Sequence, residues 1–328
     1  MKVKFVNYPK GYKKYQKEYD KAYQRVMESG DLILRKDVEE FENKLTEYVG
    51  TKYAVALNSG TDALVLALRA AGVGSEHWSV SVPSHTFKST AGAVKTAHPD
   101  AIIDLYDLDE IPEDADIGIV AHISGEIYPL IPVNYFLIED AAQALGAVKN
   151  PTSFAQTWSV YPAKILGSFG DAGALTTNNF SVYEYAKEAR NHFKTDHRDF
   201  GMNSRMDNLQ AAFLNVKFRY IDKILERRNE IAQWYLLELE GVGLPHNQPG
   251  RIWQDFIIHT KQRDSLYEFL KENNIETIKN EYPFSLKYPK LPLAAQYEAE
   301  TLRIPCNENL EDEEVQFVID TIKKFYDK

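Results

Sequence analysis

The stretch W-S-V-Y-P-A-K-I-L-G-S-F-G-D-A-G-A-L at residues 158–175 follows a segment in which an apolar run ends in an acid. That run, residues 135–138, leads into E-D-A-A-Q-A-L-G at residues 139–146. Parallel strands present their carboxyl ends to a common ligand crevice, and Asp140 falls at such an end. Lys164 lies further along the chain among small residues.

Apolar runs of the same kind recur before this segment and alternate with helical patterns. We expect strands at residues 53–57, 78–83, 101–105, 117–122 and 135–138. We expect helices at residues 17–29, 38–49, 61–71 and 87–96. Short apolar strands that alternate with helices predict an α/β fold with a mainly parallel sheet covered on both faces.

The last third of the chain has a different pattern. One long helical stretch, residues 205–239, is predicted to lead away from the sheet, and glycine and proline cluster at residues 241–250. A strand at residues 252–259 and helices at residues 263–273 and 311–325 are expected beyond that cluster. The pattern predicts two domains, residues 1–240 and residues 241–328.

Bulk composition limits the class of protein. The net charge of -10 argues against nucleic acid or an anionic membrane as a partner, since both require a basic surface. No stretch approaches the roughly 18 apolar residues that cross a bilayer. The single cysteine, Cys306, excludes an internal disulfide, so a cytoplasmic protein is expected. Residues 190–198 form a basic stretch that is either a phosphate-binding patch or a solvated loop.

Asp140 and Lys164 together have a specific chemical meaning. A lysine amine forms a Schiff base with the aldehyde of pyridoxal phosphate (PLP), and a carboxylate keeps the pyridine nitrogen protonated so that the ring accepts electrons. The pair predicts a PLP enzyme with Lys164 and Asp140 as its catalytic residues and no metal. Asp140 has a plainer alternative, which is to cap a helix at residues 141–145.

A phosphate site is expected after the first predicted strand. Ser59, Gly60, Thr61 and Asp62 follow that strand and open a helix. A helix N-terminus with small residues offers free backbone N–H groups and a favourable dipole to a phosphate. The same residues also suit an ordinary helix cap without a ligand.

Five motifs occur in the order found in the DegT/DnrJ/EryC1/StrS family of PLP-dependent nucleotide-sugar aminotransferases, which the chain resembles. They are S-G-T-D-A-L (59–64), V-P-S-H-T-F-K-S-T (82–90), E-D-A-A-Q-A-L-G (139–146), S-V-Y-P-A-K-I-L-G (159–167) and G-M-N-S-R-M-D-N-L-Q-A-A (201–212). The resemblance implies a fold type I PLP-dependent transferase. Its mainly parallel seven-stranded sheet would be flanked by helices, with a smaller C-terminal α+β domain.

The resemblance also assigns roles to residues. Ser159 would join the phosphate site, Phe87 would stack on the PLP ring, and Gln143 would approach its phenolic oxygen, although a core phenylalanine and a surface glutamine are the plain alternatives. Asn203 would reach the phosphate of a partner subunit, because it precedes a helix that leads away from the cofactor strands. A homodimer with composite sites is therefore expected.

Substrate contacts are implied for Arg190, His192, Tyr161 and Arg205, although Arg205 could instead pair with Asp207. The reaction implied is transfer of an amino group from L-glutamate to a nucleotide-linked keto sugar, for surface polysaccharide synthesis. G-D-A-G-A at residues 170–174 resembles the pattern of members that act on 3-keto sugars. A 4-keto sugar aminotransferase, a PLP-dependent dehydratase and a non-catalytic sugar-nucleotide binder stay open as alternatives.

Several positions depart from the family pattern. Phe193 replaces the glycine of R-N-H-G, Arg35 stands where glycine is common, and Glu281 stands where histidine is common before Tyr282 and Pro283. The segments at residues 105–117 and 146–158 are short. These places frequently shape the sugar pocket, so they put the substrate rather than the cofactor in doubt.

Overall fold

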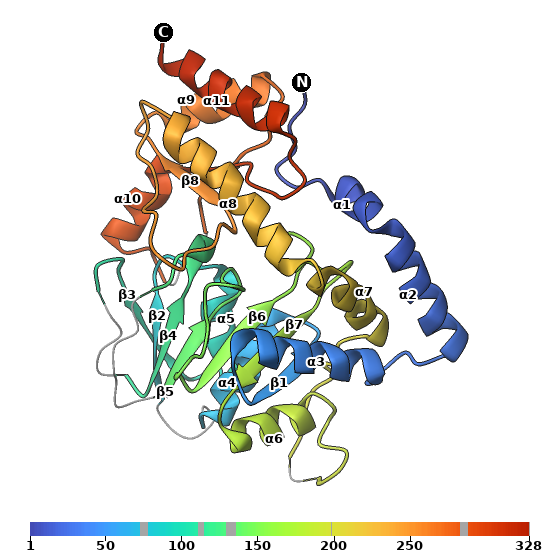
Figure 1. Ribbon diagram of the computed structural model, residues 1–328. Coiled ribbons are helices and arrows are strands. Elements are labelled where there is room, and N and C mark those ends of the chain that lie inside the picture. Colours follow the sequence, from blue (N-terminus) through green and yellow to red (C-terminus); the bar gives the residue numbers. More distant parts are fainter. Residues whose placement is uncertain (73–77, 111–114, 129–135, 198, 283–287, 328) are drawn as a thin grey trace.

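The computed structural model describes residues 1–328 except 73–77, 111–114, 129–135, 198, 283–287 and 328 (Figure 1). Three of the residues named above and part of one segment therefore lie outside the described residues. They are Tyr135 at the start of a predicted strand, Arg198 in the basic stretch, Pro283, and residues 111–114 of the short segment.

Seven strands form one sheet. They are β1 (Tyr53–Leu57), β2 (Ser79–Pro83), β3 (Ile102–Tyr106), β4 (Ile117–Ala121), β5 (Phe136–Asp140), β6 (Ala155–Ser159) and β7 (Gly173–Thr177). Their order is β1-β7-β6-β5-β4-β2-β3. Neighbouring strands from β6 through β5, β4 and β2 to β3 pair in parallel. Strand β7 is antiparallel to both β6 and β1. The prediction of a mainly parallel seven-stranded sheet is confirmed.

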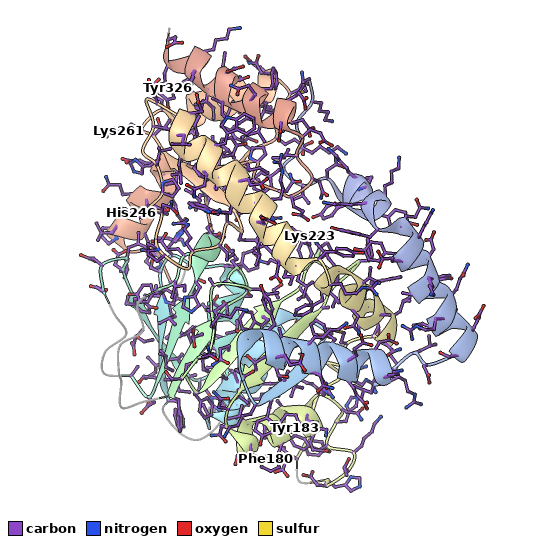
Figure 2. All side chains as sticks on the ribbon, viewed as in Figure 1. Phe180, Tyr183, Lys223, His246, Lys261 and Tyr326 are labelled. Atoms are coloured by element: carbon purple, nitrogen blue, oxygen red, sulfur yellow. The ribbon has the colours of Figure 1, made fainter. Side chains whose placement is uncertain are left out.

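Helices cover both faces of this sheet. One layer holds α4 (Gly60–Ala70), α5 (Lys88–Ala97) and α6 (Phe180–Ala189), and the other holds α3 (Lys36–Val49) and α7 (Asn208–Phe218). Alternation along β1 serves both layers, because Val55 and Leu57 join the first core and Ala54 and Ala56 join the second. The rings of Tyr53 in the edge strand β1 and Tyr183 in α6 stack at 4.8 Å. Tyr183 lies beside Phe180 on α6, at the end of the molecule opposite the C-terminal helices (Figure 2).

The C-terminal part is a smaller α+β unit, as predicted. Strands β8 (Phe256–His259), β10 (Thr301–Ile304) and β9 (Ile278–Lys279) form an antiparallel sheet in that order. Its helices are α9 (Arg263–Glu272), α10 (Pro292–Glu300) and α11 (Asp312–Tyr326). Its core also takes Val3 and the second half of α8 (Ile221–Glu238). The domain boundary at residue 241 stays a prediction, and apolar packing continues across it.

The single helix predicted for residues 205–239 is wrong, because the chain breaks between α7 and α8. Tyr220 leaves the helical region at φ -113° and ψ 9°, and its ring stacks on Tyr15 at 4.2 Å. Tyr15 joins the N-terminal helices α1 (Tyr8–Lys14) and α2 (Gln16–Ser29). The break lets α7 pack on α2 and α3 while α8 runs to the C-terminal part (Figure 1). Aromatic packing of this kind overrides the helical propensity of the intervening residues.

The described part of the chain contains no helix with the length and apolar character needed to span a membrane.

Candidate functional site

Six strands end at one edge of the sheet. Strand β1 runs in the same direction as β6, because both are antiparallel to β7. The carboxyl ends of β1, β6, β5, β4, β2 and β3 therefore meet there, where ligands of open α/β sheets bind. Asp140 is the last residue of β5, Ser159 is the last of β6, and Ser59 lies two residues after β1. The fold thus brings three of the predicted site segments to a common edge.

The predicted phosphate site, called the cup below, consists of residues 59–62 and Ser159. Its segments are closely packed. Ser59 is the N-cap of α4, and its Oγ accepts the Asp62 N–H at 3.0 Å. Gly60 and Thr61 occupy the first turn, where backbone N–H groups have no partner inside the helix. A Cβ added to Gly60 would lie 3.0 Å from the Cβ of Ser159, so only glycine allows the two segments to touch. The geometry suits a phosphate bound by backbone N–H groups and two serines.

Gly173 in β7 lies directly against the backbone of Ser59 and Gly60. A Cβ at Gly173 would lie 2.2 Å from the carbonyl carbon of Ser59 and 2.4 Å from the nitrogen of Gly60. We expect Gly173→Ala to push β7 from the cup and to lower the free energy of unfolding by about 1–3 kcal/mol. It should also weaken PLP binding, measured by titrating the apoprotein with PLP. The matched control is Gly92→Ala in α5, where an added Cβ meets nothing within 4 Å. Wild-type PLP affinity and stability in Gly173→Ala would contradict this account.

Asp140 is a buried carboxylate with two donors. Its Oδ2 accepts the Thr90 hydroxyl at 2.8 Å, and its Oδ1 accepts the Ala142 N–H at 3.3 Å. Burial raises the pKa of Asp140, while the hydrogen bonds from Thr90 and Ala142 and the charge of Lys164 oppose that rise. The helix-cap alternative is wrong, because residues 141–147 form turns and no helix. Asp140 is thus held by two hydrogen bonds at the carboxyl end of β5.

Lys164 lies in a turn that follows β6, five residues after Ser159. Its backbone N–H donates to the Tyr161 carbonyl at 2.8 Å, and the turn closes at Gly167, where a Cβ would lie 2.1 Å from the Pro162 carbonyl oxygen. Burial lowers the pKa of the Lys164 amine, and the charges of Asp255 and Asp140 raise it. The charges of Asp140 and Lys164 each affect the pKa of the other. Asp140 ends β5 and Lys164 follows the neighbouring strand β6, at the same sheet edge.

Phe87 and Gln143 meet at Tyr282. Phe87 is 58% exposed, which rules out the core alternative. Its ring lies edge-on to Tyr282 at 6.3 Å. The buried Gln143 accepts the Ser124 N–H at 2.7 Å and donates to the Tyr282 hydroxyl at 3.4 Å, so it is no surface residue. Tyr282, which belongs to the C-terminal part, therefore contacts two of the residues predicted to bind the cofactor.

The predicted substrate contacts have varied settings. Tyr161 is 50% exposed beside the Lys164 turn, and His192 is also exposed. Arg190 is buried, pairs with Glu42, and donates to the Ala56 carbonyl at 2.9 Å. Its guanidinium is therefore bound by groups of α3 and β1. Substrate contact by these residues stays a prediction.

Local contacts account for the R-N-H-F segment and for Arg205. Arg205 donates to Asn191 Oδ1 at 3.0 Å. Phe193 has φ +48°, in the left-handed region that favours glycine, and its buried ring packs edge-on to Tyr185 at 5.4 Å. Burial of that ring offsets the backbone cost, so phenylalanine can occupy a position where glycine is common.

Asn203 lies beside the cup of its own chain. Its carbonyl accepts from Asn58 Nδ2 at 3.5 Å, and the next residue, Ser204, donates to Asn58 Oδ1 at 3.1 Å. Asn58 directly precedes Ser59. The premise that its own chain carries Asn203 away from the cofactor strands is therefore wrong, because the helix starts only after Asn203 has been bound to the end of β1. The exposed side chain of Asn203 lies at the rim of the cup.

Several residues around the crevice were missed in the sequence. Thr90 ends the quoted motif V-P-S-H-T-F-K-S-T, and its spacing from Thr86 could have signalled a hydroxyl pair, which the structure places 2.9 Å apart. Gln254, Asp255 and Arg303 belong to the C-terminal part and carry no local motif. Their proximity to Lys164 arises only in three dimensions.

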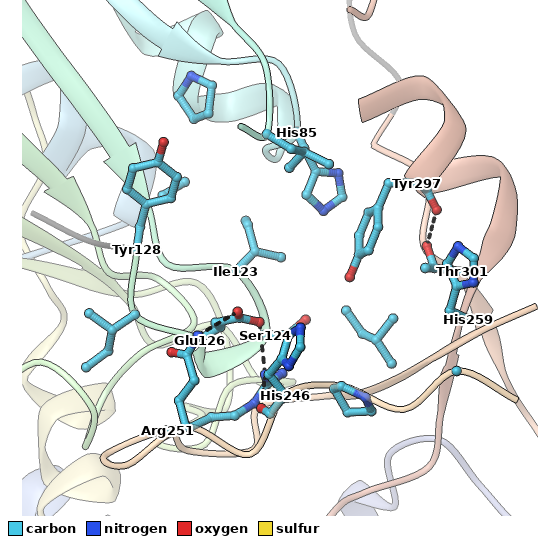
Figure 3. Close-up of a pocket in the computed structure, with 18 of the residues that line it drawn as sticks. His85, Ile123, Ser124, Glu126, Tyr128, His246, Arg251, His259, Tyr297 and Thr301 are labelled. Carbon is cyan, nitrogen blue, oxygen red and sulfur yellow. Dashed lines mark hydrogen bonds and ion pairs between the residues drawn. The ribbon is translucent and has the colours of Figure 1, made fainter. Parts of the chain in front are cut away.

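A separate cavity of about 480 Å³ lies further along the same sheet edge, against the C-terminal part (Figure 3). Tyr106, Tyr128 and Tyr297 contribute to its walls, and Arg251 donates to Glu126 there at 2.9 Å. Neither Lys164 nor Asp140 lines it. A direct link to the crevice described above is Ser124, whose N–H binds Gln143.

Comparison with known proteins agrees with this arrangement. The model of the DegT/DnrJ/EryC1/StrS aminotransferase family matches residues 13–104 and 132–323. The dTDP-3-amino-3,6-dideoxy-alpha-D-galactopyranose transaminase of Aneurinibacillus thermoaerophilus is 32% identical in an alignment that covers 95% of this chain and 96% of that protein. A protein of Geobacillus stearothermophilus named pleiotropic regulatory protein is also 32% identical, over 99% of both chains.

The fold is shared with solved structures over the full length. The crystal structure of Streptomyces venezuelae DesV in complex with a ketimine intermediate superposes with a TM-score of 0.91 at 30% identity, covering 100% of this chain and 99% of that chain. With the family match spanning most of the sequence and the motif residues gathered at one sheet edge, the chain belongs to the DegT/DnrJ/EryC1/StrS aminotransferase family.

Proposed function

We propose that this protein is a PLP-dependent aminotransferase that moves an amino group from an amino acid to a nucleotide-linked keto sugar. The observation that carries the proposal is the convergence of three features: the Lys164 amine, the buried Asp140 carboxylate and the cup of Ser59, Gly60 and Ser159. Membership of an aminotransferase family supports the same reaction class.

The residues fit the cofactor. The cup would hold the phosphate, Asp140 would face the pyridine nitrogen, Phe87 would cover the ring, and Gln143 would donate to the phenolic oxygen. When bound, PLP withdraws electrons from the carbon that exchanges its amino group and keeps that group between the two half-reactions. Among the described residues, Asp140 accepts hydrogen bonds from neutral donors, and a protonated ring nitrogen would add a charged one.

Lys164 would move the proton. Because burial lowers the pKa of its amine, a larger fraction is neutral near pH 7 and able to accept a proton from the donor's α-carbon. Asp255 and Asp140 limit that fall, so the amine can also hold the proton until it is returned. Thr90 and the Ala142 N–H keep the Asp140 carboxylate in one orientation throughout.

We propose L-glutamate as the donor and a 3-keto sugar as the acceptor. The similarity to a transaminase whose name specifies a 3-amino sugar supports the position of amination. The G-D-A-G-A pattern adds less, since Gly173 is required by contact with Ser59 and Gly60 whatever the substrate. The test is a panel of nucleotide-linked 3-keto and 4-keto sugars incubated with L-glutamate and analysed by mass spectrometry. Amination of the 4-keto sugars alone would reverse the assignment, and binding without turnover would favour a regulator.

We further propose a homodimer in which the side chain of Asn203 serves the partner's site, although its backbone lies beside the cup of its own chain. The side chain of Asn203 is exposed, and Phe87 and Tyr161 are large apolar side chains that are also exposed; a partner that covers them would support this proposal. Mixing a Lys164→Ala chain with an inactive Asn203→Ala chain should then restore activity, because one site of the mixed dimer carries both wild-type residues. The measurement is transaminase activity after subunit exchange, with each variant alone as control. If exchange is demonstrated and activity does not return, Asn203 and Lys164 act in the same chain.

A further inference from the structure

Glu298 is a buried carboxylate of α10 that binds both the large sheet and the C-terminal part. Its Oε1 accepts the Nδ1–H of His85 at 2.9 Å, and its Oε2 accepts the Tyr282 N–H at 3.1 Å. His85 follows β2 by two residues, and Tyr282 follows β9 by three. Tyr297, beside Glu298, packs edge-on against the His85 ring at 5.1 Å (Figure 3). One carboxylate therefore joins the loop after β2 to the segment after β9.

The surroundings of Glu298 keep it ionised. Burial would raise the pKa of Glu298, but the hydrogen bonds from His85 and Lys290 outweigh burial and hold that pKa below its usual value. The Nζ of Lys290 lies 2.6 Å from Glu298 Oε1. Burial lowers the pKa of His85, so its ring is neutral near pH 7 and donates through Nδ1. Three donors thus hold an anionic carboxylate in one orientation.

His85 is next to residues of the predicted cofactor site. Phe87, which would cover the PLP ring, follows His85 by two residues. The residue between them, Thr86, has its Oγ1 2.9 Å from that of Thr90, and Thr90 donates to Asp140 at 2.8 Å. The bond from His85 to Glu298 therefore anchors a short run of chain that reaches two predicted contacts of the ring.

Tyr282 meets the same contacts from the C-terminal part. Its hydroxyl accepts from Gln143, and its ring lies edge-on to Phe87 at 6.3 Å and to His85 at 5.1 Å. Because Glu298 binds one residue on each side, a shift of its carboxylate would move Phe87 and Tyr282 relative to each other.

We propose that Glu298 is a positioning residue for amino transfer, which fixes Phe87 and Tyr282 relative to each other and thereby sets the tilt of the cofactor ring. This inference rests on the proposed aminotransferase function. Removal of a proton from the donor's α-carbon is fastest when that C–H bond stands perpendicular to the plane of the ring. A change in tilt should therefore slow the chemical step while PLP still binds.

A purely structural alternative is that Glu298 only docks α10 against the large sheet. Asp107 allows this alternative to be tested, because it binds the first turn of the same helix. Its carboxylate accepts the N–H groups of Leu293 and Ala294, each at 2.8 Å. Asp107→Ala therefore removes docking bonds of α10 without removing either contact of Glu298.

The test compares the holoenzymes of Glu298→Gln and Asp107→Ala with wild type. Glutamine has nearly the same size but lacks the charge and one of the two acceptor oxygens. Glu298→Gln should change the circular dichroism of the absorption band of bound PLP. Its single-turnover rate at saturating L-glutamate should fall about 10- to 100-fold, since a misplacement of about 1 Å can cost 100-fold. Asp107→Ala should lower the melting temperature and leave the band and the rate as in wild type.

Two variants of His85 provide a second test, which decides the question if Glu298→Gln does not fold. His85→Leu lacks the donor and should show the same changes in the band and the rate. His85→Asn should restore both, because its side-chain amide can donate to Glu298.

The proposal is overturned if the band and the rate are unchanged in Glu298→Gln, or in His85→Leu where that variant replaces it. It is also overturned if Asp107→Ala shows the same changes, because docking of α10 would then be sufficient. The proposed function fails separately, if borohydride treatment of wild type leaves no PLP on Lys164.

Discussion

Lys164→Ala is expected to abolish amino transfer and to end covalent attachment of PLP, the largest effect of any single change in this protein. The wild-type holoprotein treated with borohydride should carry the reduced cofactor on the peptide that contains Lys164, and the variant should carry none. The reason is that Lys164 is the amine that the turn after β6 holds beside Asp140. Without it, neither the covalent link nor the proton acceptor is available.

The test must distinguish Lys164 from other buried lysines. Burial lowers the pKa of Lys217 and of Lys290 as well, so a lowered pKa alone does not identify the reactive amine. Lys217 lies 3.8 Å from Glu308, and Lys290 lies 2.6 Å from Glu298. Mass spectrometry of the reduced peptides decides between the three. A label on any lysine other than Lys164 would refute the central assignment.

Asp140→Asn is expected to keep PLP bound and to slow amino transfer by on the order of a hundredfold, a loss of a few kcal/mol in the transition state. A neutral amide cannot stabilise a protonated ring nitrogen, and its single oxygen can accept only one of the two hydrogen bonds that Thr90 and Ala142 donate to Asp140. The measurement is the single-turnover rate with L-glutamate, compared with PLP affinity in the same variant.

The neighbouring carboxylate provides the control. Glu139 is also buried in β5, but it faces the other way and contacts His122 Nε2 at 2.9 Å. Glu139→Gln should reduce stability and leave the single-turnover rate within severalfold of wild type. A wild-type rate in Asp140→Asn would mean that Asp140 only receives the hydrogen bonds seen in the structure.

The parts of the fold that follow from local patterns were predictable. The β1, β4 and β5 strands have apolar runs, and the cup and the lysine turn have motifs in which small residues are needed for contact. The β6 and β7 strands were not found, because their buried positions include polar residues. In the fold, Thr176 donates to Gln156 at 2.9 Å and accepts from Trp158 Nε1 at 2.9 Å, so these side chains are satisfied only after the two strands have paired.

The candidate site divides in the same way. Asp140, Ser59, Ser159 and Lys164 are each marked by the segment in which they lie. Arg303 is not, because it comes near Lys164 only when β10 of the C-terminal part packs beside the turn after β6. The helix break at Tyr220 was missed for a similar reason, since it is fixed by stacking on a residue of the N-terminal arm.

The inclusion of Val3 in the C-terminal core bears on how the protein is made. The Val3 N–H donates to the Asn274 carbonyl, and the Val3 carbonyl accepts from Glu276, each at 2.9 Å. A ribosome that adds roughly 5–20 residues per second would leave this segment without its partners for on the order of tens of seconds. The large sheet can assemble during that interval, whereas the C-terminal unit cannot take up Val3 until residues 274–276 have been synthesised. Nascent chains arrested before residue 274 should therefore leave their first residues open to protease.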